Sequence, residues 1–324
     1  MDKIIIEGIG AYAPSKIVTN DDLSKIVDTN NEWIEGRTGI KERCISQGED
    51  TSHMAIKASM LAIERANISP IDIDLIILAT CTPDMFIPST ACIVQKHIGA
   101  KNALAFDISA ACTGFVYGLK LADSLMKTND YKHALVIGAE NLSKVVDWKD
   151  RGTCVLFGDG AGAAILSKGK DDGIIDSICK SEGDKWEHIT IGADDVVNPF
   201  IEEEVVKEKH LGMNGGEVFK FATRVIPESV KEILTKNNVS IDEIDYIVPH
   251  QANSRIIEYA AKKLKISNDK FYMNISRYGN TSAASIPIAL NEMYEKNLLK
   301  KGSKIVLVGF GGGLTYGCAL INWK

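Results

Sequence analysis

Residues 67–77 read NISPIDIDLII, and residues 238–248 read NVSIDEIDYIV. The two stretches are separated by 171 residues, and each has the pattern of a turn followed by an apolar strand. The same separation aligns HALVIG (133–138) with KIVLVG (304–309), two apolar runs that end in glycine and are typical of buried strands. The chain therefore repeats its own pattern.

A third match falls at the same separation. It aligns SAACTGFVYGL (109–119) with NTSAASIPIAL (280–290). Three coincidences at one separation are hard to obtain from the ordinary monotony of alternating strands and helices, so they indicate two similar halves. We expect residues 1–170 and 171–324 to form these halves.

Each half alternates short apolar strands with amphipathic helices, as in helix 52–66 before strand 74–80 and helix 217–236 before strand 245–249. This alternation is typical of an α/β fold in which helices cover a mostly parallel sheet. Ligands of such sheets collect at the carboxyl ends of the strands, near the junction between halves. Residues just past strand ends are therefore the first candidates for a functional site.

The composition of the 324-residue chain is that of an ordinary globular protein, with 45% hydrophobic and 25% charged residues. Its length suits about two domains with a large core. The chain has 37 Lys and Arg against 43 Asp and Glu, which gives a net charge of -6. Because phosphate-backbone binding requires a basic excess, we expect no nucleic-acid partner.

The cysteines and the apolar runs of the sequence bear on the cellular location of the protein. The seven cysteines are an odd number without a Cys-x-x-Cys pair, which argues against a disulfide framework and a structural zinc site. No stretch approaches the roughly 18 apolar residues of a membrane span, and the start MDKIIIEGIG lacks a signal-peptide pattern. We expect a cytoplasmic protein that does not bind membranes.

Cys112 is the strongest candidate for a nucleophile. The run 103–108 reads as a strand and 113–126 as a helix, so Cys112 lies at a strand-to-helix corner among small residues. The dipole and free N–H groups of a helix N-terminus favour a thiolate, the form that attacks an electrophile. Cysteine is also a common small buried hydrophobe, and we assign that role to the other six.

Three further features lie at strand ends. His250 directly follows the strand DYIVP, and Asn280 takes the place of Ser109 in the repeat, so both belong at the same end of the sheets as Cys112. The run VLVGFGGGLTYG (306–317) allows backbone N–H groups to approach a ligand oxygen, as in an oxyanion hole. A structural histidine, an Asn helix cap and a plain glycine turn are the alternatives.

Other cofactor motifs fail in their context. GIGAYAP (8–14) has Pro14 where a dinucleotide-binding helix should run, and GDGAG (158–162) lacks the spacing and the following Lys of a P-loop. No His-Glu-x-x-His motif occurs. We therefore expect no nicotinamide, ATP or metal site.

Several of these stretches together resemble one known family. The stretches are DISAACTGF (107–115), PHQAN (249–253), YGNTSAASIP (278–287), WIEGRTGIKER (33–43), DRGTCVLFGDGAGAAIL (150–166) and GFGGGLTYG (309–317). They are similar, in the same order along the chain, to the motifs of 3-oxoacyl-[acyl carrier protein] synthase III, a member of the thiolase superfamily.

The resemblance implies a five-layered αβαβα fold of two pseudo-symmetric halves, a homodimer and a catalytic triad of Cys112, His250 and Asn280. It implies that a short acyl-CoA acylates Cys112, that malonyl-acyl carrier protein then loses CO2 while His250 and Asn280 stabilise the enolate, and that 3-oxoacyl-acyl carrier protein is the product. This reaction would initiate type II fatty acid biosynthesis without a metal or organic cofactor.

The resemblance also assigns roles around the triad. The backbone N–H groups of Cys112 and Gly312 would form the oxyanion hole, and Phe310 would shield the site. The residues implied for binding are Trp33, Arg37, Arg151 and Asn253 for CoA, and Arg255, Lys262 and Lys263 for the acidic acyl carrier protein. The last three come from a helix whose opposite face, at positions such as Ile256 and Leu264, is apolar.

One departure and three alternatives stay open. In PDMFIPST (83–90), Phe86 precedes Ile87, whereas the family often has Phe next to the Pro of the loop that limits the acyl pocket, so the primer is not fixed. The alternatives are a homologue in a secondary pathway, an acyltransferase without decarboxylation and a non-catalytic acyl-binding protein. Hydroxymethylglutaryl-CoA synthase shares the fold, but no motif places its catalytic glutamate near Cys112.

Overall fold

The computed structural model describes residues 3–170, 173–200 and 208–324. The larger sheet has five strands in the order β1–β7–β6–β4–β5. In chain order these strands are β1 (Lys3–Tyr12), β4 (Leu75–Ala79), β5 (Leu104–Ile108), β6 (His133–Glu140) and β7 (Gly160–Gly169). β4 runs parallel to β5 and β6, whereas β7 is antiparallel to β6 and β1.

The second large sheet repeats this arrangement. Its order is β11–β12–β13–β8, with strands β8 (Gly173–Ser181), β11 (Tyr246–Pro249), β12 (Lys304–Gly311) and β13 (Thr315–Asn322). β11 is parallel to β12, and the other two pairs are antiparallel, as in the series β4–β6–β7–β1 of the first sheet. The expected pseudo-symmetry is therefore confirmed, whereas the division at residue 170 stays a prediction because residues 171–172 lie outside the described residues.

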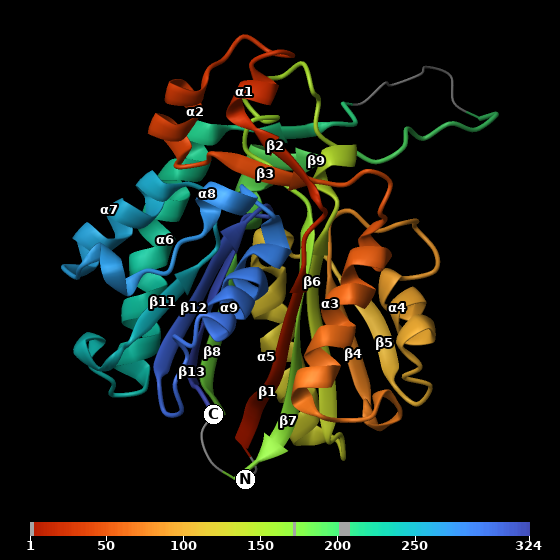
Figure 1. Ribbon diagram of the computed structural model, residues 1–324, viewed down its shortest axis with the longest axis vertical. Helices are drawn as coiled ribbons and strands as arrows, with labels where there is room; N and C mark the ends of the chain where they lie inside the picture. The colour runs from red at the N-terminus through yellow and green to blue at the C-terminus, as the bar shows by residue number, and fades with distance from the viewer. Residues whose placement is uncertain (1–2, 171–172, 201–207) are drawn as a thin grey trace.

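Helices and sheets alternate in five layers (Figure 1). The inner layer contains α5 (Gly114–Thr128) and α9 (Ser285–Glu295), each of which contacts strands of both sheets. The outer layers are α3 (Thr51–Ala66) and α4 (Thr90–Ile98) on the first sheet, and α6 (Gly215–Lys236) and α7 (Ser254–Leu264) on the second sheet. This is the expected αβαβα thiolase-like architecture.

The inner helices are buried because they are apolar on more than one face. Phe115 and Met126 of α5 and Ile286 and Met293 of α9 share one cluster with residues of both sheets. A helix between two sheets can present no broad polar face to water, and each such side chain stabilises the fold by about 1.5–3 kcal/mol on burial. The start of each inner helix is thereby fixed at the junction between the halves.

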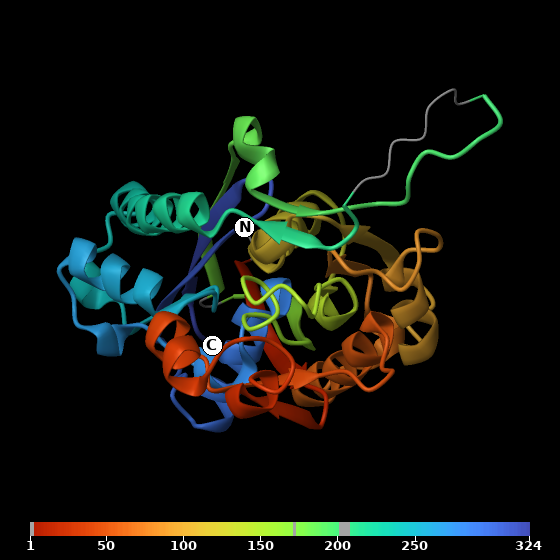
Figure 2. The same cartoon turned by 90° about the horizontal axis from the view of Figure 1, so that it is seen from above.

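Shorter elements cover the end of the sheets where β4, β6, β11 and β12 terminate (Figures 1 and 2). Two small antiparallel sheets lie there, one of β2 (Lys16–Thr19) and β3 (Glu42–Ile45) and one of β9 (Ile189–Ile191) and β10 (Leu211–Met213). The short helices are α1 (Asn20–Leu23), α2 (Asn31–Thr38) and α8 (Ile275–Tyr278). These short sheets and helices therefore cover the end of the two large sheets.

Expected and observed elements agree to within a few residues. The helices expected at 52–66, 113–126 and 217–236 are α3, α5 and α6, and the strands expected at 74–80, 103–108 and 245–249 are β4, β5 and β11. Within the described ranges, no helix is both long enough and apolar enough to cross a membrane.

Gly138 of β6 tests the packing of the two halves. A Cβ on Gly138 would lie 2.2 Å from the carbonyl oxygen of Ala283, just before α9. Because this contact is with backbone, we expect Gly138→Ala to lower the free energy of unfolding by about 1–3 kcal/mol, measured by urea denaturation.

The matched control is Gly36→Ala in α2, where a Cβ meets nothing within 4 Å. This exposed helical substitution should stabilise the protein by about 0.5–1 kcal/mol. Equal effects of the two substitutions would contradict the packing described for Gly138.

Candidate active site

Cys112 lies in a short 3-10 turn, Ala111–Thr113, between β5 and α5. Ala111 adopts a left-handed backbone with φ of 46°. Gly311 of the other half packs so closely that a Cβ on it would lie 2.7 Å from the Cys112 backbone nitrogen. The corner expected from the sequence is therefore present, and a glycine is required opposite it.

His250 follows β11 and is almost completely buried. Its backbone N–H donates to the carbonyl of Val308 at 2.8 Å, which extends the pairing of β11 with β12. Its ring Nδ1 lies 2.7 Å from the Ser285 hydroxyl, and its ring packs edge-on against Phe310 with centroids 5.2 Å apart. These contacts fix the ring and turn Nε2 away from Ser285.

Asn280 is held by backbone contacts on both sides. Its N–H donates to the carbonyl of Leu156 at 2.8 Å, and its own carbonyl accepts from Gly158 at 3.0 Å. Its side-chain Oδ1 accepts the N–H of Ser282 at 2.9 Å. Because Oδ1 is engaged, the amide NH2 group is the donor that remains for the cavity.

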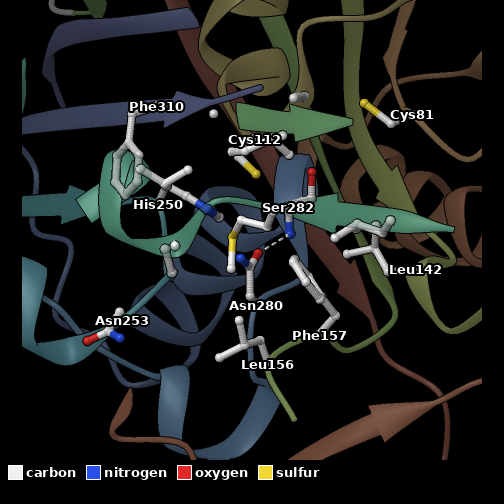
Figure 3. A pocket seen from close by; sticks show the side chains of 18 of the residues that line it. Cys81, Cys112, Leu142, Leu156, Phe157, His250, Asn253, Asn280, Ser282 and Phe310 are labelled. Carbon is white, nitrogen blue, oxygen red and sulfur yellow. Dashed lines mark hydrogen bonds between the residues drawn. The ribbon is translucent and has the colours of Figure 1, made fainter. Parts of the chain in front are cut away.

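The three side chains line one cavity of about 160 Å³. Figure 3 shows Cys112, His250 and Asn280 directed toward one another from separate segments of the chain. Most other lining side chains are apolar, among them Leu142, Leu156, Phe157, Ile189, Leu211, Met213, Val218, Phe219, Ile256 and Phe310. The structure thus brings the expected triad together in surroundings that suit an acyl chain.

Burial dominates the electrostatics of the site. It raises the pKa of the Cys112 thiol to about 12, while a hydrogen bond from the Ser282 hydroxyl lowers that pKa and the nearby Glu140 carboxyl raises it. Burial also lowers the pKa of His250 to about 3. His250 is therefore a neutral imidazole at physiological pH, able to donate one hydrogen bond from one ring nitrogen.

The glycine run lies beside Cys112, as expected. Gly311 lines the cavity of the triad, and Gly312 lines a neighbouring cavity of about 800 Å³ that also contains Ala111 and Phe86. A Cβ on Gly312 would lie 3.4 Å from the Cβ of Ala111. The glycine run therefore lies close to Cys112. The oxyanion hole formed by the backbone N–H groups of Cys112 and Gly312 stays a prediction.

The residues expected to bind CoA lie close to one another, and one of them lines the cavity. The guanidinium groups of Arg37 and Arg151 each lie 5.0 Å from the centre of the Trp33 ring. Asn253, at the N-terminus of α7, lines the cavity and donates from Nδ2 to the carbonyl of Arg37 at 3.0 Å. The structure therefore connects this aromatic and basic cluster to the triad.

The basic residues of α7 lie on its exposed face. Arg255, Lys262 and Lys263 are exposed, while the apolar positions expected to face the core, Ile256, Ile257, Ala260, Ala261 and Leu264, are buried. The helix orientation expected from its periodicity is confirmed.

The expected acyl-pocket loop connects β4 to α4. Phe86 and Ile87 of this loop are 78% and 86% exposed, and Phe86 borders the second cavity. Exposed apolar side chains of this size commonly mark a contact surface.

Sequence reasoning missed three polar residues beside the triad, namely Ser282, Ser285 and Glu140. Ser285 contacts His250, and Glu140 accepts a hydrogen bond from Ser282 at 3.0 Å. No sequence motif placed a glutamate near Cys112, and the structure brings the Glu140 carboxyl there through Ser282. Glu140 could have been found among the residues just past strand ends. It comes two residues after the expected strand HALVIG (133–138), and it aligns with Gly311 in the repeat.

In the part of the chain that the structure describes, no group of three or more His, Cys, Asp or Glu side chains could hold a metal ion.

Comparisons with known proteins identify related sequences along nearly the whole chain. Residues 106–183 match the family model of 3-oxoacyl-[acyl-carrier-protein] synthase III, and residues 234–323 match the model of its C-terminal region. The chain is 58% identical to the beta-ketoacyl-[acyl-carrier-protein] synthase III of Clostridium novyi over 324 residues, which covers all of both chains.

Solved structures show the same relationship. The 3-oxoacyl-[acyl-carrier-protein] synthase III of Aquifex aeolicus is 47% identical, with a TM-score of 0.92 over 99% of this chain and 100% of the other. The priming beta-ketosynthase of the R1128 polyketide pathway is 31% identical, with a TM-score of 0.93 over 100% and 97% of the two chains.

The neutral state of His250 predicts a pH dependence of stability. Between the ordinary pKa of 6.5 and about 3, the unfolded state binds a proton at this histidine that the folded state does not. This group therefore lowers the free energy of unfolding as the pH falls through that window, by up to about 1.4 kcal/mol per unit. We expect His250→Asn to reduce the pH slope between pH 6 and 4, measured by urea denaturation.

The matched control is His97→Asn, at an exposed position of α4. Its slope should equal that of the parent. If the two variants lose the same slope, the buried neutral state of His250 is refuted.

Proposed function

The chain belongs to the 3-oxoacyl-[acyl-carrier-protein] synthase III family, and from this premise we propose that Cys112, His250 and Asn280 carry out its reaction. It is a condensing acyltransferase that initiates fatty acid biosynthesis. The observation that carries the assignment is the convergence of a cysteine, a neutral histidine and an asparagine amide in one apolar cavity.

In the proposed reaction, Cys112 attacks the carbonyl of a short acyl-CoA, and the thiolate of CoA leaves. Malonyl-acyl carrier protein then enters the same cavity and loses CO2. The resulting carbanion attacks the acyl-Cys112 thioester, and 3-oxoacyl-acyl carrier protein leaves. A thiolate suits both steps, because it attacks a thioester readily and is also a good leaving group.

His250 and Asn280 supply hydrogen bonds to the enolate that decarboxylation forms. The Ser285 hydroxyl accepts the N–H of Gln251 at 3.4 Å and can donate to Nδ1 of His250, which leaves the imidazole proton on Nε2. The Asn280 Oδ1 is occupied by Ser282, so its NH2 group is the second donor. Two such donors in a buried and mostly apolar cavity stabilise negative charge far better than they would in solvent.

Substrate carriers are proposed to dock at the cavity entrance. Trp33, Arg37 and Arg151 offer planar groups on which the adenine of CoA can stack, and Asn253 lies between them and the triad. The basic residues Arg255, Lys262 and Lys263 on α7 are proposed to bind the acidic acyl carrier protein. A local basic patch is needed because the chain carries a net charge of -6.

We also propose a homodimer and a cytoplasmic location. In the described part of the chain no strand pairs with the outer side of the edge strand β5, and Phe86, Ile87 and Leu104 at this side are exposed apolar residues, which supports a contact with a second copy. All seven cysteines are unpaired, which suits a reducing compartment. The proposed reaction uses acyl-CoA and malonyl-acyl carrier protein as substrates and no separate cofactor.

The first test is intact-mass analysis after incubation with a panel of acyl-CoA thioesters. We expect the parent protein to gain one acyl group, which malonyl-acyl carrier protein then removes as 3-oxoacyl product. Cys112→Ala should show no adduct, whereas His250→Ala and Asn280→Ala should form the adduct and lose at least about 100-fold in the rate of CO2 release.

Cys81→Ala is the matched control, because Cys81 lines the same cavity. It should still form the adduct. An adduct on Cys112→Ala would overturn the nucleophile, and an adduct on the parent that malonyl-acyl carrier protein leaves in place would favour an acyltransferase without condensation.

A second test concerns the docking of acyl carrier protein. Arg255→Glu reverses an exposed charge on α7, so we expect it to raise KM for malonyl-acyl carrier protein about tenfold and to leave KM for malonyl-CoA nearly unchanged. Lys96→Glu on α4, at the other side of the molecule, makes the same charge change as a control (Figure 1). Equal effects of Arg255→Glu on the KM values of both substrates would contradict the docking of acyl carrier protein on α7.

A further inference from the structure

Glu140 is a buried carboxyl group beside the cavity that the reaction above does not use. It is the last residue of β6, and none of its surface is exposed. Its hydrogen-bond partners in the described part of the chain are neutral donors rather than a lysine or an arginine. An unpaired buried carboxylate is costly, so its position beside the nucleophile requires an explanation.

Four groups donate to this carboxyl. The hydroxyl of Ser282 donates to Oε1 at 3.0 Å, and the hydroxyls of Thr82 and Thr80 donate to Oε2 at 2.6 and 3.2 Å. The backbone N–H of Cys81 donates to both oxygens at 3.1–3.2 Å. Three of the four donors belong to the segment after β4, and only Ser282 comes from the second half of the chain.

The Ser282 hydroxyl also reaches the nucleophile. The Ser282 hydroxyl lowers the pKa of the Cys112 thiol, and both side chains line the cavity of the triad (Figure 3). The backbone N–H of Ser282 is fixed on Asn280 Oδ1 at 2.9 Å. One hydroxyl therefore connects the thiol of Cys112 to the carboxyl of Glu140.

We propose that Glu140 accepts the proton of Cys112 through the Ser282 hydroxyl and returns it later in the reaction. Glu140 acts through Ser282 and does not touch the substrate, so it is a positioning residue and proton store for the nucleophile. The proposal rests on the proposed function, because it assumes that Cys112 attacks the acyl-CoA.

The steps balance over one turnover. As the Cys112 sulfur attacks the thioester, its S–H proton passes to Ser282, and the Ser282 proton passes to Glu140. CoA leaves with the electron pair of its C–S bond and takes a proton from water. In the condensation the Cys112 thiolate leaves the acyl group, and the stored proton returns from Glu140 through Ser282 to sulfur. Water therefore supplies the one proton that the overall reaction consumes.

The transfer avoids creating a new charge in the cavity. Before transfer the charge lies on the carboxylate, and after transfer it lies on the thiolate, so the pair carries one negative charge in both forms. Burial raises the pKa of both Cys112 and Glu140. The state in which the two residues share one proton is therefore favoured over the state in which both are ionised. A thiolate formed by losing its proton to solvent would instead add a second buried charge.

Other titratable groups face the same carboxyl. Cys81 follows β4, and Lys144 lies in the turn Leu142–Lys144 after β6, with its amine donating to the carbonyls of Thr82 and Pro83. Neither provides a side-chain hydrogen bond to Glu140 in the described residues. Ser282 is the link that carries the path to Cys112.

The test measures how fast Cys112 is acylated by acetyl-CoA and alkylated by iodoacetamide between pH 6 and 8.5, with the modified peptide identified by mass. In the parent the proton stays within the pair, so both rates should change little with pH. In Glu140→Gln and Ser282→Ala the proton must go to solvent. Both rates should fall about 100-fold at pH 7 and rise about tenfold per pH unit.

Ser282→Ala provides a variant that should fold. Ser282 has φ of 47°, and its counterpart in the repeat is Ala111, which adopts 46°, so alanine tolerates this backbone. Thr80→Val is the matched control, because it removes another donor to Glu140 without interrupting the path. Its rates should keep the nearly flat pH profile of the parent.

Each outcome decides the proposal. A flat parental profile in Ser282→Ala or in folded Glu140→Gln overturns it, as does faster alkylation of Glu140→Gln at neutral pH, which would show that Glu140 only raises the pKa of Cys112. If acyl-CoA panels acylate no variant and not the parent, the proposed function fails, while the iodoacetamide profiles still decide the proton path.

Discussion

The burial of α5 and α9 between the two large sheets holds both halves and the cavity between them in place. Each inner helix begins where the halves meet, and each beginning is pressed against a glycine of the opposite half. Gly311 faces Cys112, and Gly138 faces Ala283. Because a side chain at either glycine would collide with backbone, the nucleophile can approach the second half only while these positions stay free of a Cβ.

The same burial sets the chemistry of the cavity. With few polar neighbours, the imidazole of His250 stays neutral and the thiol of Cys112 holds its proton strongly. The site can therefore offer hydrogen-bond donors to an enolate without offering a proton that would quench the carbanion. The polar contacts that do exist are few and specific. Ser285 orients His250, and Ser282 orients Asn280 while its hydroxyl lowers the pKa of Cys112.

The residues proposed to bind CoA and those proposed to bind acyl carrier protein lie at one edge of the molecule. Trp33 and Arg37 belong to α2, and Asn253 and the exposed cations belong to the beginning and outer face of α7, which lie beside each other in Figure 1. A hydrogen bond from Asn253 to the backbone of Arg37 joins the two helices. A carrier docked on α7 would thus lie beside the residues proposed to bind CoA, so the two proposed half-reactions can follow one another in a single cavity.

The layered α/β fold could be predicted from the sequence, because the periodicity of apolar residues and the repeat at 171 residues are patterns along the chain. The sequence also placed Cys112 and His250, since residues at strand ends face the junction of such folds. The contacts of Ser282, Ser285 and Glu140 appear only in the folded chain. Glu140 and Ser282 lie 142 positions apart and share no motif spacing. Their side chains meet because the two sheets pack on the inner helices. The order of residues along the chain does not show that these two side chains are close in space.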